Sequence, residues 1–199
     1  MGSTNSRICK GSALRGQIAV LFAVGLTVFI ALIGLGVDVG RALSVKTQQK
    51  NALEAVSEAC MAQGNAVKYA QNPGDEARAQ VVELLQANGY TGKATIWYAE
   101  APSSETGAKD RYGGTLVRLE RQTPTTLLGV AGVDVLEPAA ERCWVTHSYS
   151  SAQVWRPPTD GAGYVEVAME GGRITSRTSA AASFADAPSK LVDTVRAAI

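Results

Sequence analysis

The chain has 199 residues, 46% of them hydrophobic, and a formal net charge of +1 at pH 7. This length suits one domain of modest size and argues against a second large one. Because the charge is nearly balanced and no block of Lys and Arg occurs beyond the N-terminal tail, the composition gives no indication of nucleic-acid binding.

The most distinctive segment is an uncharged apolar run of 20 residues, from Ile18 to Val37. A helix of this length rises roughly 30 Å and matches the hydrocarbon core of a bilayer. Its 13 Leu, Ile, Val and Phe residues together favour insertion by roughly 4–8 kcal/mol. We therefore predict a transmembrane helix over residues 18–37. A cleaved secretory signal is the alternative, but its apolar core is normally shorter, about 7–15 residues.

The charges beside this run predict its orientation. Arg7, Lys10 and Arg15 precede it without an acidic residue. The positive-inside rule then places residues 1–17 in the cytoplasm as a tail and the bulk of the chain outside.

The helix is predicted to continue beyond the membrane as a stem, residues 38–64. Good helix formers predominate there, and apolar residues from Ala42 to Cys60 recur at spacings of three, four and seven. Gly64 is a plausible terminator.

Small residues recur within and just beyond the predicted membrane helix, and two of them bracket Asp38. Such residues let two membrane helices approach closely, although they are also common in membrane helices that make no such contact. Asp38 and Arg41 are either an interfacial pair that fixes the depth of the helix, or Asp38 meets a basic group of a neighbouring subunit. The candidate helix-packing residues are Ala19, Ala23, Thr27, Ala31, Gly36 and Gly40.

Residues 65–150 predict an α+β head with a small antiparallel sheet, on the exported side of the membrane. Apolar periodicity, β-branched residues and turn signals define its elements. We expect a helix over 75–88, strands over 93–100 and 115–122, a short helix or turn over 125–130, and one or two strands over 133–150 interrupted near Pro138.

Residues 151–199 are predicted to form a C-terminal hairpin and helix extension. A break at residues 155–161, which contain Pro-Pro, precedes it. Gly171-Gly172 is expected to join strands 164–170 and 173–175 as a two-residue hairpin. The small polar residues 176–187 are expected to be a loop, and residues 189–199 a terminal helix.

The chain offers little catalytic chemistry. Cys60 and Cys143 would share an oxidising compartment, so we predict a disulfide between them, which would stabilise the fold by about 4 kcal/mol. The single histidine, His147, and the absence of any close cysteine pair, phosphate-binding loop or recognised nucleophile argue against catalytic, cofactor-binding and metal sites. We therefore predict a protein that is not an enzyme and uses no cofactor.

Three N-terminal motifs carry a resemblance to a known family. In order they are Arg15-Gly-Gln-Ile-Ala-Val-Leu-Phe-Ala23, Gly36-Val-Asp-Val-Gly40-Arg41 and Gln49-Lys-Asn-Ala-Leu-Glu-Ala-Val-Ser-Glu-Ala59. With a looser match at residues 117–140, they resemble the TadE/TadG-like proteins of the bacterial tight-adherence (Tad, Flp) pilus system.

The resemblance implies a pilin-like, single-pass protein of the bacterial inner membrane. It implies a non-enzymatic minor pilin or assembly component of an adhesive pilus, with a role in cell adhesion and a head that acts either in the periplasm or at the pilus tip. Its partners would be other pilus or pilus-assembly proteins, contacted through the transmembrane helix and the head. A membrane-tethered periplasmic binding or sensing module is the alternative.

Two departures from the family refine these expectations. Prepilins of the TadE kind carry a glutamate five residues after the cleavage glycine, but counting from Gly16 that position is Leu21. The resemblance is therefore closer to TadG, with the helix as a permanent anchor. Longer TadG proteins carry a metal-binding D-x-S-x-S motif, which this chain lacks, so no metal-dependent adhesion is expected.

Overall fold

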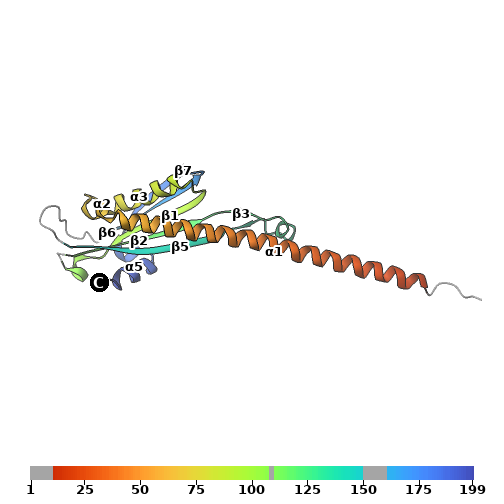
Figure 1. The fold of residues 1–199 in the computed structure, drawn as a ribbon. Helices are drawn as coiled ribbons and strands as arrows, with labels where there is room; N and C mark the ends of the chain where they lie inside the picture. Colours follow the sequence, from red (N-terminus) through yellow and green to blue (C-terminus); the bar gives the residue numbers. More distant parts are fainter. Residues whose placement is uncertain (1–10, 108–109, 150–160) are drawn as a thin grey trace, which may run out of the picture. The chain divides into compact units, whose positions relative to one another are not determined.

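The computed structural model describes residues 11–107, 110–149 and 161–199. A long N-terminal helix is followed by a small antiparallel sheet, which confirms the predicted α+β class (Figure 1). The predicted tail up to residue 10 and most of the predicted break before residue 161 lie outside the described residues. The elements are α1 (Gly11–Ala62), α2 (Gly64–Tyr69), α3 (Pro73–Ala87), β1 (Gly92–Glu100), α4 (Ser103–Thr106), β2 (Asp110–Glu120), β3 (Thr123–Pro124), η1 (Leu128–Ala131), β4 (Val135–Leu136), β5 (Ala139–Tyr149), β6 (Gly161–Glu170), β7 (Arg173–Ser183), η2 (Phe184–Asp186) and α5 (Ser189–Arg196).

The chain divides into two compact units. We call residues 1–41 with 124–136 the anchor unit, and residues 42–123 with 137–199 the head unit. Helix α1 contributes its first part to the anchor unit and its last part to the head unit.

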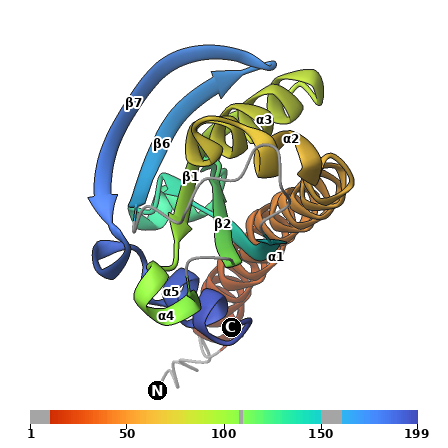
Figure 2. The same ribbon diagram turned by 90° about the vertical axis from the view of Figure 1, so that its left-hand side faces the viewer.

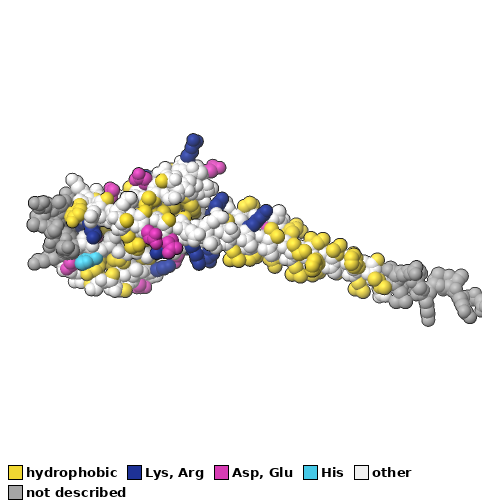
Figure 3. Space-filling model, in the orientation of Figure 1, with side chains coloured by type: hydrophobic (Ala, Val, Ile, Leu, Met, Phe, Trp, Pro, Cys, Tyr) yellow, Lys and Arg dark blue, Asp and Glu magenta, His cyan; other side chains and the backbone are white. Residues whose placement is uncertain are grey.

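The first part of α1 carries its apolar side chains on the outside. From Gln17 onward the helix is long and apolar enough to cross a membrane. Side chains such as Leu21 and Phe22 are 70% and 71% exposed. Hydrophobic side chains cover this part of the helix (Figure 3). No proline interrupts α1, and its isolated glycines cost about 1 kcal/mol each, which a run this rich in good helix formers tolerates.

The head unit is built on a five-stranded antiparallel sheet of order β5-β2-β1-β6-β7 (Figure 2). Ile96 of β1 lies opposite Val117 of β2 and Val165 of β6, which fixes the register at the centre. Gly171 and Gly172, with φ of 54° and 79°, form the predicted two-residue turn between β6 and β7.

Two hydrophobic cores lie on opposite faces of this sheet, because successive residues of a strand point to opposite sides. The last part of α1 and α3 supply Leu53, Val56, Val81 and Leu85 to one core. Helix α5 and η2 supply Leu191, Val195 and Phe184 to the other.

The C-terminal region differs from the prediction in one element. Residues 176–183, expected to be a loop, continue β7 along β6. Strand β7 lies at the sheet edge and its residues are almost all exposed, so no apolar alternation marks it as a strand. The hairpin that we predicted to be an extension is thus part of the head sheet, because its first strand, β6, pairs with β1.

The predicted Cys60–Cys143 disulfide is not present, and both cysteines are free thiols. Cys60 belongs to the core formed with α1 and α3, whereas Cys143 packs against the core formed with α5. The sheet therefore separates the two sulfur atoms. Burial raises the pKa of the Cys60 thiol to about 11, which keeps it protonated and unreactive at neutral pH.

Candidate functional site

Within the anchor unit, the segment between β3 and β4 folds into a hairpin loop that lies beside α1 (Figure 1). At its base, the Thr125 N–H donates to the Asp134 carbonyl oxygen at 3.0 Å. Nearer the tip, the Val133 N–H donates to the Leu128 carbonyl oxygen, also at 3.0 Å. Gly132 ends η1 with a φ of 87°, a left-handed conformation that glycine adopts without strain. We call residues 125–135 the anchor loop.

The Asp38 carboxylate binds the anchor loop to the helix. Its Oδ1 accepts from the Thr126 N–H at 3.0 Å and from the Thr126 Oγ1 hydroxyl at 2.8 Å. Its Oδ2 accepts from the N–H groups of Leu127 and Leu128, both at 2.9 Å. With 2% of its surface exposed, Asp38 is a buried charge whose hydrogen bonds all reach one short segment.

The Asp38 carboxylate provides acceptors for backbone N–H groups that have none within their own turn. The first N–H groups of a helical turn have no partners within the turn, and η1 starts at Leu128. A carboxylate satisfies them with charge-assisted hydrogen bonds. Hydrogen bonds from the backbone N–H groups of Leu128 and Thr126 outweigh desolvation and hold the pKa of Asp38 well below its usual range. Asp38 therefore stays ionised.

A glycine allows the loop to approach the helix. The Leu127 side chain lies against Gly34, and a Cβ at Gly34 would overlap it. At Gly36 and Gly40, in contrast, an added Cβ would have no atom within 4 Å. Gly34 lies four residues before Asp38, on the same face of the helix, so it continues the contact toward the N-terminus.

An apolar groove of about 500 Å³ lies between the helix and the loop. The helix lines it with residues between Thr27 and Leu35, and the anchor loop with Leu127, Leu128 and Val130. The site thus combines one buried carboxylate, one close glycine contact and an open apolar groove, all within the anchor unit.

The structure gives Asp38 a partner that neither hypothesis from the sequence had named. Arg41 Nη1 lies 3.4 Å from Thr126 Oγ1, so both members of the predicted pair contact the same threonine. Sequence reasoning also missed Gly34. The available signal was an acidic residue just after an apolar run, together with a Thr-Thr-Leu-Leu segment whose first N–H groups need an acceptor.

The predicted helix-packing residues divide between two faces. Successive residues of a helix are about 100° apart, so Gly36 and Gly40 lie roughly opposite Gly34 and the loop. Thr27 and Ala31 line the groove instead, and Ala19 and Ala23 continue that face toward the N-terminus. All six are exposed within the chain itself.

The head unit contains a buried polar network. Tyr98 Oη donates to Glu100 Oε1 at 3.0 Å, and Arg111 Nε lies 3.3 Å from the same oxygen. The Glu100 and Arg111 side chains are only 3% and 5% exposed. Burial, followed by the adjacent Glu100 charge, raises the pKa of Tyr98. Desolvation of the two charges offsets much of the attraction within a buried pair of this kind, so its net contribution to stability is small.

His147 lies near the end of β5, and its Nε2 is 3.0 Å from Asp110 Oδ1. Its ring stacks on Tyr112 with the centroids 4.3 Å apart. The side chain is 43% exposed and lies outside both hydrophobic cores of the head.

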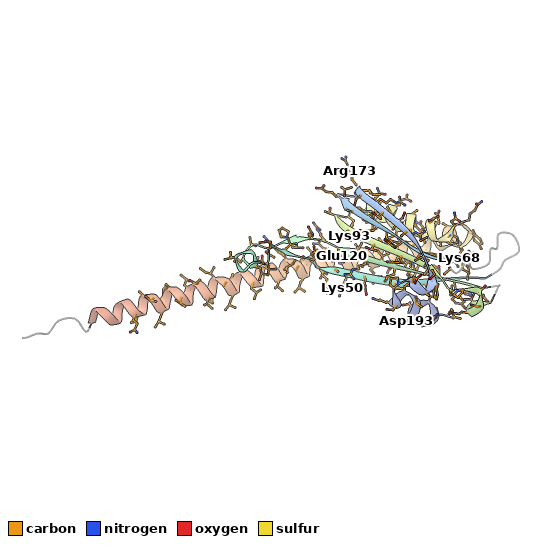
Figure 4. The ribbon with its side chains drawn as sticks, turned by 180° about the vertical axis from the view of Figure 1, so that it is seen from behind. Lys50, Lys68, Lys93, Glu120, Arg173 and Asp193 are labelled. Atoms are coloured by element: carbon orange, nitrogen blue, oxygen red, sulfur yellow. The ribbon has the colours of Figure 1, made fainter. Side chains whose placement is uncertain are left out.

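A second groove, of about 480 Å³, lies in the head unit beside Lys93 and Glu120. These residues face each other on β1 and β2 (Figure 4). Lys93 Nζ pairs with Glu166 Oε2 at 2.8 Å, and Glu120 Oε1 accepts from Arg118 Nε at 2.8 Å. The charges of Lys93 and Glu120 are thus engaged with neighbouring residues.

Comparison with known proteins gives one match. Residues 16–57 match the family model described as "Putative Flp pilus-assembly TadE/G-like". No curated protein and no solved structure matches the chain. The matched segment contains the whole apolar run together with Gly34, Asp38 and Arg41, and it confirms the resemblance seen in the sequence. Residues 16–57 are therefore TadE/G-like, which supports a role related to pilus assembly and association with a membrane.

Proposed function

We propose that the protein is a non-enzymatic minor pilin or assembly component of a Tad/Flp-type adhesive pilus, anchored in the bacterial inner membrane. The family match over residues 16–57 is the observation that carries this proposal. The head lies in the periplasm, where it contacts other pilus components. The N-terminus lies in the cytoplasm, because basic residues precede the apolar run.

The exposure of the apolar run supports membrane anchoring. Leu21, Phe22 and Phe29 are each more than 60% exposed within the chain, an arrangement that water disfavours and lipid favours. Leu21 also replaces the glutamate by which prepilins dock, so the helix serves as a lasting anchor.

We assign contacts with other pilus subunits to the face that carries Gly36 and Gly40. These glycines leave open space beside the backbone, so a second helix can approach closely there. The anchor loop occupies the other side of the helix and does not compete for this face.

Gene deletion and complementation test the proposal. Deletion is expected to abolish piliation and surface adherence, and the unaltered gene to restore both. The double variant Gly36→Leu/Gly40→Leu should restore them poorly at normal protein level, because the added side chains fill the packing face. Val37→Leu/Val39→Leu adds bulk to the same turns and should restore them fully. Unchanged piliation in the deletion strain would contradict the proposal.

A membrane-tethered periplasmic binding module is the second candidate, and the groove beside Lys93 and Glu120 favours it. The double variant Lys93→Gln/Glu120→Gln separates the two functions. Under the pilus proposal it assembles pili normally, whereas a binding module would lose its response while its membrane level stayed constant.

A further inference from the structure

The anchor loop exposes apolar side chains that have no cover within the chain. Val130 at its tip is 86% exposed, and Leu127, Val133 and Val135 are 40–42% exposed. An exposed apolar tip of this kind marks a surface meant for lipid or for another protein.

Many backbone N–H groups of the loop are nonetheless hydrogen-bonded within the anchor unit. Asp38 accepts the N–H groups of residues 126–128, and carbonyl oxygens within the loop accept those of residues 125, 130, 132 and 133. A bilayer tolerates non-helical backbone only where its polar groups are satisfied inside the protein. The loop therefore combines paired backbone groups with apolar side chains, the two properties that hydrocarbon requires.

The position of the loop along α1 sets its depth. Leu127 contacts Gly34, and the groove extends along the helix from Thr27 to Leu35. These positions span about 12 Å of helix rise, from the middle of the apolar run toward its C-terminal end. If residues 18–37 cross the bilayer, the side chains of the loop tip lie at the level of the outer acyl chains.

The charged residues of α1 nearest the loop lie just beyond the end of the apolar run. Asp38 and Arg41 follow the apolar run, and Arg41 is exposed, as is common for basic residues at the boundary of a membrane helix. Asp134, the acidic residue of the loop itself, stands at the base of the hairpin, where its carbonyl oxygen accepts from the Thr125 N–H. Asp38 and Arg41 thus follow the apolar run, and the most exposed apolar side chain of the loop, Val130, lies at its tip.

We propose that the anchor loop inserts into the outer leaflet of the inner membrane, with lipid acyl chains filling the groove between the loop and α1. This inference rests on the proposed membrane anchoring. Lipid is the occupant that continues the surface on both sides of the groove, because the helix above and below it exposes the same kind of apolar side chain. The loop gives the anchor a second contact with the bilayer and restrains its rotation.

Fluorescence quenching in vesicles tests the insertion. The full chain is reconstituted into phosphatidylethanolamine and phosphatidylglycerol vesicles that contain lipid brominated near the upper end or near the middle of the acyl chain. Three variants are compared with the unaltered protein, whose native tryptophans give the background. Val130→Trp reports on the loop, Leu26→Trp on the middle of the helix, and Arg173→Trp on the β6–β7 turn of the head, where Arg173 points away from the sheet (Figure 4).

The proposal predicts a different result for each variant. Val130→Trp loses most of its added emission with lipid brominated near the upper end of the chain and less with the deeper bromine. Leu26→Trp shows the reverse order, and Arg173→Trp is quenched by neither lipid.

Two results would overturn the insertion while leaving the membrane anchor in place. One is a quenched Leu26→Trp beside a Val130→Trp that only aqueous iodide quenches, because the loop would then lie in water. The other is a Val130→Trp that neither bromine nor iodide reaches, because a second copy or another protein would then cover it. An unquenched Leu26→Trp would overturn the proposed anchoring itself and the insertion with it.

Discussion

The two units of this protein arrange the same types of side chain in opposite ways. In the head unit, Leu53 of α1 is 1% exposed and packs into the core beside the sheet. In the anchor unit, Leu21 of the same helix is 70% exposed. The two parts of this continuous helix therefore differ in burial. The last part packs its apolar side chains inside the head unit, and the first part exposes them.

The interactions that stabilise the fold also differ between the two units. The head relies on a five-stranded sheet covered on both faces by apolar side chains. The anchor unit fixes its loop with one carboxylate and one glycine contact. Where hydrocarbon surrounds a protein, burial of apolar groups gives no driving force, so hydrogen bonds and close packing must hold a loop in place.

The largest expected effect compares two leucines of α1. Leu53→Ala should destabilise the head by about 2–5 kcal/mol, because it leaves a cavity in a packed core. Leu21→Ala should change the free energy of unfolding of the head by less than about 0.5 kcal/mol, because no protein atom packs around an exposed side chain. Urea denaturation in detergent, followed by tryptophan fluorescence, measures both. Equal losses would show that the two parts of the helix do not differ as described.

The next prediction concerns the carboxylate of the anchor unit. Asp38→Ala removes the acceptor of three backbone N–H groups, so the anchor loop should detach and lose its protection from hydrogen exchange. Exchange in the sheet of the head should stay unchanged. Mass-spectrometric hydrogen exchange in lipid nanodiscs resolves both regions. Arg41→Gln, which removes only the longer contact to Thr126, is the milder control. A loop still protected in Asp38→Ala would disprove the anchoring role.

A pair of glycines tests the close contact of the helix with the loop. Gly34→Ala should displace Leu127 and raise exchange in the anchor loop, because the added methyl group overlaps that side chain. Gly36→Ala meets open space and should leave exchange unchanged, with a small gain in helix stability of about 0.5–1 kcal/mol. If both substitutions behaved alike, Gly34 would have no special part in holding the loop.

The ionisation of Asp38 makes a prediction about pH. Hydrogen bonds from the loop lower its folded-state pKa, so its stabilising contribution is present above the ordinary carboxyl pKa, near about 4, and is lost only as the pH falls through the lowered value. Protection of the anchor loop, corrected for the intrinsic exchange rate, should therefore be constant from about pH 7 to about pH 4. A loss of protection between about pH 6 and about pH 4 would mean that the carboxylate is not held as observed.

The smallest expected effect concerns the cysteines of the head. Cys60 and Cys143 should both remain thiols in the protein isolated without reductant, because the sheet lies between them. Cys60 should react slowly with maleimide in the folded protein and rapidly in urea, since burial raises its pKa to about 11. A Cys60–Cys143 linked peptide in a non-reducing digest would instead support the disulfide predicted from the sequence.

Local patterns were sufficient to predict most elements of the fold. The uncharged run and the helix formers after it predicted a helix over residues 18–64, which begins later than the observed Gly11–Ala62 but ends near the same point. Gly171-Gly172 predicted the β6–β7 turn. Strand β7 was missed beyond residue 175 because an edge strand exposed on both faces carries no alternation. Its pairing through β6 to β1 joins segments about 70 residues apart, which no local pattern encodes.

Only part of the candidate site could be predicted from the sequence. Asp38 was identified as a boundary residue, but its partners at residues 126–128 lie 88–90 positions away. Gly34 resembled any other glycine of a membrane helix until Leu127 was seen against it. Such contacts depend on where the sheet returns the chain, and therefore on the fold as a whole.

The fate of residues 18–37 in the cell tests the central claim most directly. Membranes from cells that produce the protein are washed with alkaline carbonate, and the intact mass of the extracted protein is measured. If the apolar run is a permanent anchor, the chain remains in the membrane fraction and its mass includes residues 18–37. A shorter chain that begins beyond residue 37 and is found in the soluble periplasmic fraction would contradict the anchor, and with it the lipid setting of the anchor loop.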